Sequence, residues 1–313
     1  MLAALLTTLL LASPPTGWRA SAQAFGETAQ IEVRDLDAAA AEVVLRLAMA
    51  ELLAAETDAV AITVRLNGAA GRDPVLFDET ALAMLRRALD FCRWSEGAHG
   101  PLGGVLYDLW QQSLPPAGAL LAARETTACD RLLLDEEAGT ARMAAGSRID
   151  LRGFATGWAV DRATEVLVAH GATNARVRLG RVERGVGPGP AGRGWATKLD
   201  LPPEWLEPLA PARLQDRALA MAGREPALVI AGDRYAAHLN LSVGRPAEGV
   251  VATVAVAELA IDAQALSITM FVLGQREGMM RLGSLRPKPS VAWLLGSGEG
   301  LPLLTTHRWA EVD

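Results

Sequence analysis

The chain has few cysteines and no long apolar run, and each shortage excludes a class of protein. Its two cysteines among 313 residues are too few for a disulfide-rich scaffold, and its 30 glycines show no collagen-like period. No apolar run reaches the roughly 18 to 20 residues that a membrane-spanning helix needs. The net charge is −6, so the surface would repel a phosphate backbone, and we expect no nucleic-acid partner and no integral membrane span.

Apolar residues, in contrast, are plentiful. Hydrophobic residues make up 50% of the chain and charged residues 21%. Burial of this much apolar surface can offset the entropy lost on ordering, so we do not expect disorder as the dominant state. The length allows one large domain or two of ordinary size.

The first residues resemble an export signal. The apolar run Leu2–Ala12 has the length of a signal-peptide core, and Ala20–Ala22 forms a small-residue cleavage pattern that ends before Gln23. We therefore interpret residues 1–24 as a signal peptide and residues 25–313 as the folded domain of a periplasmic or otherwise exported protein. Since no Lys or Arg precedes the apolar run, the alternative is a buried N-terminal helix of a protein that stays in the cytoplasm.

The two cysteines leave a choice open. Cys92 lies on the apolar face of a predicted helix, where buried free thiols are common, and Cys129 follows 37 residues later. The two could pair in an exported chain, but we favour two free thiols.

The periodicity of apolar residues predicts a mixture of helices and strands. Helices are predicted over 35–56, from a cap at 78 to 92, over 155–170 and over 261–273. Strands are predicted over 59–66, 131–134, 174–179, 195–199, 227–231, 250–254 and 290–295. The glycine- and proline-rich stretch 185–194 is predicted to be a loop. Because no strict strand–helix–strand rhythm occurs, we expect an α+β fold, or α/β with an irregular sheet, in one continuous domain.

The stretch 149–162 (IDLRGFATGWAVDR) carries the clearest chemical signal. Gly153, Ala155 and Gly157 precede or open a predicted helix, where small residues let backbone N–H groups approach an anion and the helix dipole favours negative charge. A phosphate or pyrophosphate ligand is the physical expectation. Glycines before a helix are also common as ordinary turn residues, so this pattern alone leaves both interpretations open.

The same stretch resembles a longer motif of the ApbE-like flavin transferases, Asp-Leu-Gly-Gly-Ile-Ala-Lys-Gly-Tyr-Ala-Val-Asp-Arg. The matching positions are Asp150, Leu151, Gly153, Ala155, Gly157, Ala159, Val160, Asp161 and Arg162. Three further stretches resemble family motifs in the same order: 97–110 (GAHGPLGGVLYDLW), 244–246 (GRP) and 271–274 (FVLG). The resemblance covers about residues 35 to 300.

This resemblance implies a single α+β domain that binds FAD and Mg²⁺. It implies transfer of FMN from FAD to a Thr or Ser hydroxyl of a flavin-accepting partner protein, with release of AMP. The implied cofactor-binding residues are Asp150, Gly153, Ala155, Thr156, Gly157 and Gly180. The implied catalytic residues are His238 and Asn240, and the implied metal ligands are Ala155, Asp262 and Gln264.

The chain departs from the family pattern at the metal and at the catalytic histidine. Gln264 stands where the motif has its metal-binding Asp, and Ile268 where it has Thr. Asp262 lies two residues earlier, which on a helix is about 200° of rotation, so an adjustment of the preceding loop would be needed to bring it in. The motif's His falls on Ala237. The adjacent His238 could reach the site through a bulge or could be an ordinary surface histidine.

Other departures keep more than one function in play. The flavin-contacting Gly-Gly-Asp of the motif is Gly180-Arg181-Val182 here. Trp158 is expected in the core, with stacking on a flavin ring as the alternative. Besides the transferase we therefore consider a flavin-binding protein without catalysis and a ligand-free accessory of an electron-transfer complex. A carboxylate that can reach the metal would distinguish the first from the second, and the colour of the purified protein would distinguish both from the third.

Overall fold

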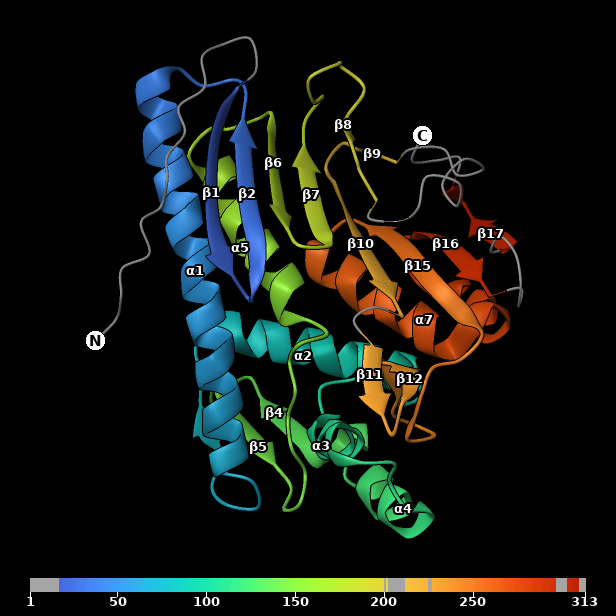
Figure 1. The fold of residues 1–313 in the computed structure, drawn as a ribbon. Helices are drawn as coiled ribbons and strands as arrows, with labels where there is room; N and C mark the ends of the chain where they lie inside the picture. Colours follow the sequence, from blue (N-terminus) through green and yellow to red (C-terminus); the bar gives the residue numbers. More distant parts are fainter. Residues whose placement is uncertain (1–16, 200, 202–211, 225–226, 297–302, 310–313) are drawn as a thin grey trace.

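An antiparallel sheet forms the centre of the fold (Figure 1). The computed structural model describes residues 17–199, 201, 212–224, 227–296 and 303–309. Within those residues the sheet has eight strands in the order β1 (Trp18–Ala24), β2 (Glu27–Val33), β6 (Ala175–Leu179), β7 (Val182–Val186), β10 (Arg217–Gly223), β15 (Val250–Ala257), β16 (Ser290–Leu295) and β17 (Leu303–His307).

Three helices pack against one face of this sheet. They are α1 (Ala38–Gly68), α5 (Ala155–Ala169) and α7 (Ala260–Leu282). Helix α1 contacts β1 and β2, α5 contacts β6 and β7, and α7 contacts β10 and β15. Helix α5 also packs between the other two helices, so its first turn lies against the first turns of α7.

The side chains of β10 show how both faces of the sheet are used. Ala218 and Ala220 belong to the core beneath the helices, and their small side chains let α7 lie close to the strand. Leu219 and Met221 point to the opposite face, where they join a second apolar cluster that contains Trp195. This alternation follows from the period of two in a strand.

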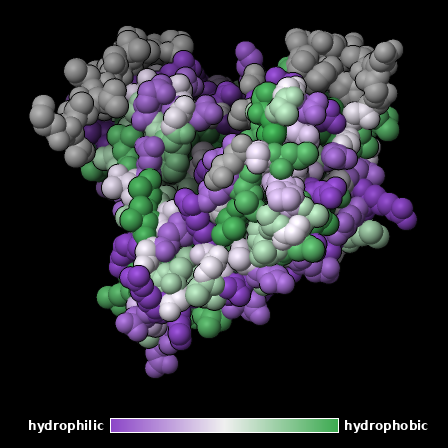
Figure 2. Space-filling view, turned by 60° about the horizontal axis from the view of Figure 1, so that its bottom comes forward, coloured by the Kyte–Doolittle hydropathy of each residue, from purple (hydrophilic) through white to green (hydrophobic). Residues whose placement is uncertain are grey.

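The remaining elements gather at one end of the sheet and along its outer face. They are β3 (Val75–Leu76), α2 (Glu79–Trp94), α3 (Gly104–Gln112), α4 (Ala117–Glu125), a 3₁₀ turn (Cys129–Arg131), β4 (Leu132–Asp135), β5 (Thr140–Met143), β8 (Trp195–Ala196), β9 (Arg213–Leu214), β11 (Ala227–Ile230), β12 (Asp233–Ala236), β13 (Leu239–Asn240) and β14 (Arg245–Pro246). Figure 2 turns this end forward and shows hydrophilic and hydrophobic residues interspersed over it. Among the described helices, none is both long and apolar enough to cross a membrane.

Several predicted elements are confirmed. The predicted cap of the second helix is correct, because the Asp78 side chain accepts a hydrogen bond from the backbone N–H of Ala81. Helix α5 ends one residue before its predicted end, and Gly171 has the positive φ expected after it. Strand β16 has the predicted bounds, and the α+β class is correct.

The strand predicted over 59–66 is wrong, because these residues continue α1. Their β-branched residues favoured a strand, but Ala55, Ala59, Ile62 and Leu66 are buried at spacings of four, three and four. This is the period of a helix that presents one face to the core, and burial of that face outweighs the small helix penalty of β-branched residues.

The expected boundary between signal and domain also differs from the structure. Residues Trp18–Ala24 form β1, which pairs along its whole length with β2, and Ala20 and Ala24 are buried. Cleavage before Gln23 would divide this strand, so the expectation that residues up to about 22 have few contacts with the body is wrong from Trp18 onward. The apolar run Leu2–Ala12 lies outside the described residues.

The prediction of two free thiols is wrong as well. Cys92 and Cys129 form a disulfide that joins α2 to the 3₁₀ turn before β4. The 37-residue separation is large enough for the cross-link to restrict the unfolded chain substantially. Such bonds persist in oxidising compartments.

The position of β1 predicts the effect of truncation. A chain that starts at Gln23 loses five residues of β1, including Trp18, whose indole N–H donates to the Leu36 carbonyl oxygen. We expect its free energy of unfolding to fall by about 3 kcal/mol or more, as for loss of a packed aromatic residue. Urea unfolding of this chain beside one that starts at Gly17 checks the prediction, and equal stabilities would contradict it.

Candidate functional site

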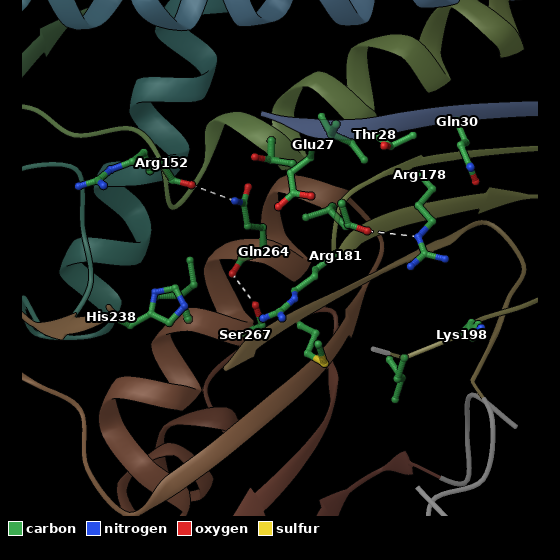
Figure 3. A pocket seen from close by; sticks show the side chains of 17 residues that line it. Glu27, Thr28, Gln30, Arg152, Arg178, Arg181, Lys198, His238, Gln264 and Ser267 are labelled. Atoms are coloured by element: carbon green, nitrogen blue, oxygen red, sulfur yellow. Dashed lines mark hydrogen bonds between the residues drawn. The ribbon is translucent and has the colours of Figure 1, made fainter. Parts of the chain in front are cut away.

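A pocket of about 670 Å³ opens at the junction of the sheet with α5 and α7 (Figure 3). The residues that line it come from β2, from the loop before α5 and its first turn, from the β6–β7 hairpin, and from β10. Others come from the segment after β8, the segment before β13, and α7. They are Glu27, Thr28, Gln30, Arg152, Thr156, Arg178, Leu179, Gly180, Arg181, Val182, Lys198, Leu199, Met221, His238, Gln264, Ser267 and Ile268.

The lining is cationic although the protein as a whole is acidic. Four of the described lining residues are Arg or Lys, and Glu27 is the single carboxylate among them. Arg152 contributes mainly its backbone, because its guanidinium forms an ion pair with Asp150 and stacks over Tyr107. Arg178 donates from Nε to the Gly180 carbonyl oxygen at 3.2 Å, within the pocket wall (Figure 3), and its Nε also lies 3.9 Å from Glu183 Oε2.

The predicted anion loop is held together by its own hydrogen bonds. Asp150 accepts from the backbone N–H and the guanidinium of Arg152, so its carboxylate is directed to this partner. Ala155 is buried, and its N–H donates to the Leu151 carbonyl oxygen at 2.8 Å. Neither Asp150 nor Ala155 is among the described residues that line the pocket, whereas Thr156 is.

The two glycines of the loop serve packing rather than an open ligand site. A Cβ on Gly157 would lie 2.5 Å from the Ala260 carbonyl oxygen of α7, and one on Gly153 would lie 2.5 Å from the His99 ring. Both residues must therefore be glycine because protein atoms approach them closely. The expected backbone approach is real at both positions, but it is made by α7 and by His99.

The side-chain amide of Gln264, a residue of α7, lies against the N-terminus of α5. The Gly157 N–H donates to Gln264 Oε1 at 2.7 Å, and Gln264 Nε2 donates to the Arg152 carbonyl oxygen at 3.0 Å (Figure 3). The donor and acceptor needs of these two backbone groups fix the orientation of the amide. The amide thus joins α7 to both ends of the predicted anion loop.

The predicted metal ligands do not come together. Asp262 forms a two-pronged ion pair with Arg87 of α2, on another side of α7 from Gln264. Ile268 lines the pocket with an apolar side chain, and no cluster of three or more potential His, Cys, Asp or Glu ligands exists in the described part of the chain. Mg²⁺ requires several hard oxygen ligands, so these residues do not fit it.

His238 lines the pocket, as its proximity to the family position suggested. Its ring packs edge-on against Phe271, with 5.4 Å between the ring centroids. Burial, together with the positive charges of Arg181 and Arg152, lowers the pKa of His238 to about 4. The imidazole is therefore neutral at pH 7 and can accept a proton.

Asn240 holds the turn that follows β13. Its Oδ1 accepts from the N–H and the hydroxyl of Ser242, and its Nδ2 donates to the Val272 carbonyl oxygen. It is not among the described lining residues, so its predicted catalytic role gains no support from its position. Gly180, by contrast, lines the pocket with a φ of 55° in the β6–β7 turn.

Trp158 and its neighbours Asp161 and Arg162 have structural positions. Trp158 is buried in the core, as expected, with the Arg162 guanidinium over its ring. Asp161 and Arg162 do not pair with each other. Asp161 forms a buried ion pair with Arg184, and Arg162 bonds to two carboxylates of α1.

Three features in or beside the pocket were not predicted from the sequence. The alternation in β6 places Arg176 and Arg178 on the face away from the helices, a signal that could have been read from the strand pattern. Lys198 carries no motif. The third feature is His99, which is 3% exposed, stacks on Phe154, and has no hydrogen-bond partner for Nε2 among the described residues.

Comparisons with known proteins agree with this architecture. The model of the ApbE family matches residues 25–292. The chain belongs to the ApbE family. A curated relative, the FAD:protein FMN transferase of Treponema pallidum (strain Nichols), is 31% identical over 267 residues, which cover 77% of this chain and 72% of the relative.

Solved ApbE structures share the fold. The ApbE protein of Thermotoga maritima superposes with a TM-score of 0.81 at 21% identity, covering 94% of this chain and 98% of that chain. The flavin transferase ApbE of Vibrio cholerae superposes with a TM-score of 0.79 at 20% identity, covering 94% and 97%. At these identities the structures establish the ApbE fold, and the family assignment comes from the sequence matches.

The contact between α5 and α7 makes Gly157 sensitive to substitution. In Gly157→Ala the new methyl group meets backbone atoms of Ala260 and Ile261, so we expect a loss of about 2 kcal/mol or more. Gly118→Ala is the matched control, because Gly118 is helical and has no atom within 4 Å of its Cβ position; it should gain up to about 1 kcal/mol. Urea unfolding measures both, and a Gly157→Ala chain as stable as the control would contradict the packing.

Burial of His99 predicts a loss of stability in acid. Burial lowers the pKa of His99 to about 3 from 6.5, so the unfolded chain binds more protons than the folded chain between these values. The neutral His99 therefore makes its full contribution to the free energy of unfolding above about pH 6.5. That contribution is lost as the pH falls, by about 2 kcal/mol at pH 5.

The variant His99→Phe keeps the stacking on Phe154 and removes the titrating group. Its free energy of unfolding should fall about 2 kcal/mol less than that of the native chain between pH 7 and pH 5. His170→Gln is the control for the removal of a histidine side chain, because His170 is exposed. An unaltered pH dependence in His99→Phe would contradict the assignment.

Proposed function

We propose that this chain binds FAD in the pocket and transfers FMN to a Thr or Ser hydroxyl of a flavin-accepting protein, releasing AMP. The observation that carries the proposal is the cationic pocket, which is lined by four residues that the family resemblance placed at the site: Thr156, Gly180, His238 and Gln264. Membership of the ApbE family and the name of the curated relative support the same reaction.

The chain's own residues suit the reaction in two ways. Arg181 and Lys198 bring positive charge to the diphosphate. This charge favours anion binding and stabilises the negative charge that develops on the leaving phosphate. The neutral His238 imidazole is placed to accept the hydroxyl proton. The acceptor oxygen then bonds to the FMN phosphorus, the P–O–P bond breaks, and AMP leaves with the bridging oxygen.

The second candidate is a flavin-binding protein without catalysis. It is favoured by the unassembled metal ligands, since Asp262 is paired with Arg87 and Ile268 offers no oxygen. The Mg²⁺ dependence that the resemblance implies is for the same reason not part of our proposal.

AMP release decides between the two candidates. With FAD, excess protein and water in place of the acceptor hydroxyl, the native chain should release FMN and AMP, and His238→Ala should slow the release by about 10² to 10⁴, as for loss of a general base. His170→Ala is the matched control and should leave the rate unchanged, because His170 is exposed at the far end of α5. Chromatography of the nucleotides measures the rates. Bound FAD with no release of AMP would favour the second candidate.

We also propose that the protein is exported. The support is the Cys92–Cys129 disulfide, which fits an oxidising compartment, together with the apolar run at residues 2–12. A processing site upstream of Trp18 would leave β1 intact. The acceptor would then be an exported or membrane-anchored protein with its acceptor hydroxyl on the same side.

A further inference from the structure

Among the described residues that line the pocket, Glu27 is the single carboxylate, it belongs to no cluster of three or more potential metal ligands, and the other charged groups are cationic. The amide of Gln264 stands at the position where the family motif has a carboxylate. It is 8% exposed and uses both its oxygen and its nitrogen, one on the Gly157 N–H and the other on the Arg152 carbonyl oxygen. The oxygen keeps one lone pair beside the Gly157 N–H, but it is neutral, whereas the carboxylate of the family motif would bring a negative charge to a cation.

The other oxygens near this position are also engaged. The Ser267 hydroxyl donates to the Gln264 carbonyl oxygen at 2.9 Å, and the Thr269 hydroxyl donates to the Ala265 carbonyl oxygen at 2.7 Å. Asp262 is held by Arg87. Because Mg²⁺ gives up its hydration water reluctantly, neutral oxygens that are already bonded do not compete for it.

Three cationic side chains face the space that a diphosphate would occupy. Arg178 is the last residue but one of β6, Arg181 follows in the β6–β7 turn, and Lys198 comes from the segment after β8 (Figure 3). Arg181 lies on the Gln264 and Ser267 side of the pocket and Lys198 on the opposite side (Figure 3). One guanidinium group can donate two parallel hydrogen bonds to phosphate oxygens, and an ammonium group adds a point charge.

We propose that this pocket binds the diphosphate of a flavin dinucleotide without a divalent cation, with Arg178, Arg181 and Lys198 supplying the positive charge and the Gln264 amide closing the metal position. The inference rests on the proposed FAD binding and makes its metal requirement specific to this chain. The amide also fixes the loop that carries Thr156, a task that needs a donor and an acceptor on one side chain. A carboxylate at position 264 could not donate to the Arg152 carbonyl oxygen.

Calorimetric titration of the native chain with FAD, in excess EDTA and in excess Mg²⁺, tests the inference directly. We expect dissociation constants that agree within about twofold in the two buffers, and affinity that falls as salt is added, because the attraction is ionic. An affinity at least tenfold higher in Mg²⁺ would overturn the inference and leave the proposed function standing. Absence of FAD binding in both buffers would overturn both.

Two lysines provide a matched pair of variants. Lys198→Gln should weaken FAD binding in EDTA by about tenfold, which corresponds to about 1.4 kcal/mol. Lys288→Gln removes an exposed charge that lies outside the pocket and should leave the affinity unchanged. Equal affinities for the two variants would overturn the role of Lys198. Because both lysines are exposed, neither change should affect folding.

The variant Gln264→Glu tests the metal position with almost no change of shape. It adds a negative charge beside the cationic groups and removes the donor to the Arg152 carbonyl oxygen. FAD binding should weaken in EDTA and should recover in part in Mg²⁺, so that a metal response appears only in the variant. If Gln264→Glu binds FAD as the native chain does in both buffers, the amide has no part in closing the position.

Discussion

The contact between the first turns of α5 and α7 is the constraint on which the site depends. Gly157 lets the backbones of the two helices touch. Asp161, one turn further along α5, accepts hydrogen bonds from the N–H groups of Ala260 and Ile261 at the start of α7. Gln264 completes the junction by bonding back to Gly157. Every pocket residue of the two helices is positioned by this junction.

The junction is held by buried charge as well as by packing. Asp161 is 5% exposed and bonds to Arg184 of β7, so the sheet, α5 and α7 meet at one carboxylate. Burial raises the pKa of Asp161 to about 6, against the opposing effects of Arg184 and of the two N–H groups. Removal of one partner would leave an uncompensated buried charge, which is costly. The same junction brings Gln264 against the first turn of α5, where a protein side chain accepts from the Gly157 N–H.

Electrostatics give the pocket its preference for anions. The chain carries a net charge of −6, yet cations dominate the described pocket lining. The low pKa of His238 has burial as its first cause, and the positive charges of Arg181 and Arg152 act in the same direction. An anionic ligand meets a local field opposite in sign to that of the protein as a whole.

Local patterns in the sequence predicted the local structure well. The cap at Asp78, helix α5 and strand β16 follow from capping chemistry and periodicity within a few residues. Position in the fold decided the failures. Val60 and Val64 favoured a strand but lie on the exposed face of a long helix. The small residues of β1 match a cleavage pattern as well as they match an edge strand.

Only part of the site could be predicted, because it is assembled from distant segments. The family resemblance located Thr156, Gly180, His238 and Gln264, which all line the pocket. It could not show that Asp262 would meet Arg87, 175 residues away along the chain, or that Cys92 would meet Cys129. The cationic lining comes from strands and connections that no single motif spans, so its charge becomes visible only after folding.

A crystal structure of the FAD complex grown with Mn²⁺ tests the central claim most directly, because Mn²⁺ replaces Mg²⁺ and is located by its anomalous scattering. The account predicts the FAD diphosphate beside Arg181 and Lys198, the Gln264 amide still bonded to the Gly157 N–H, and no anomalous peak in the pocket. A Mn²⁺ ion bound to Gln264 Oε1 and to the phosphate oxygens would contradict it.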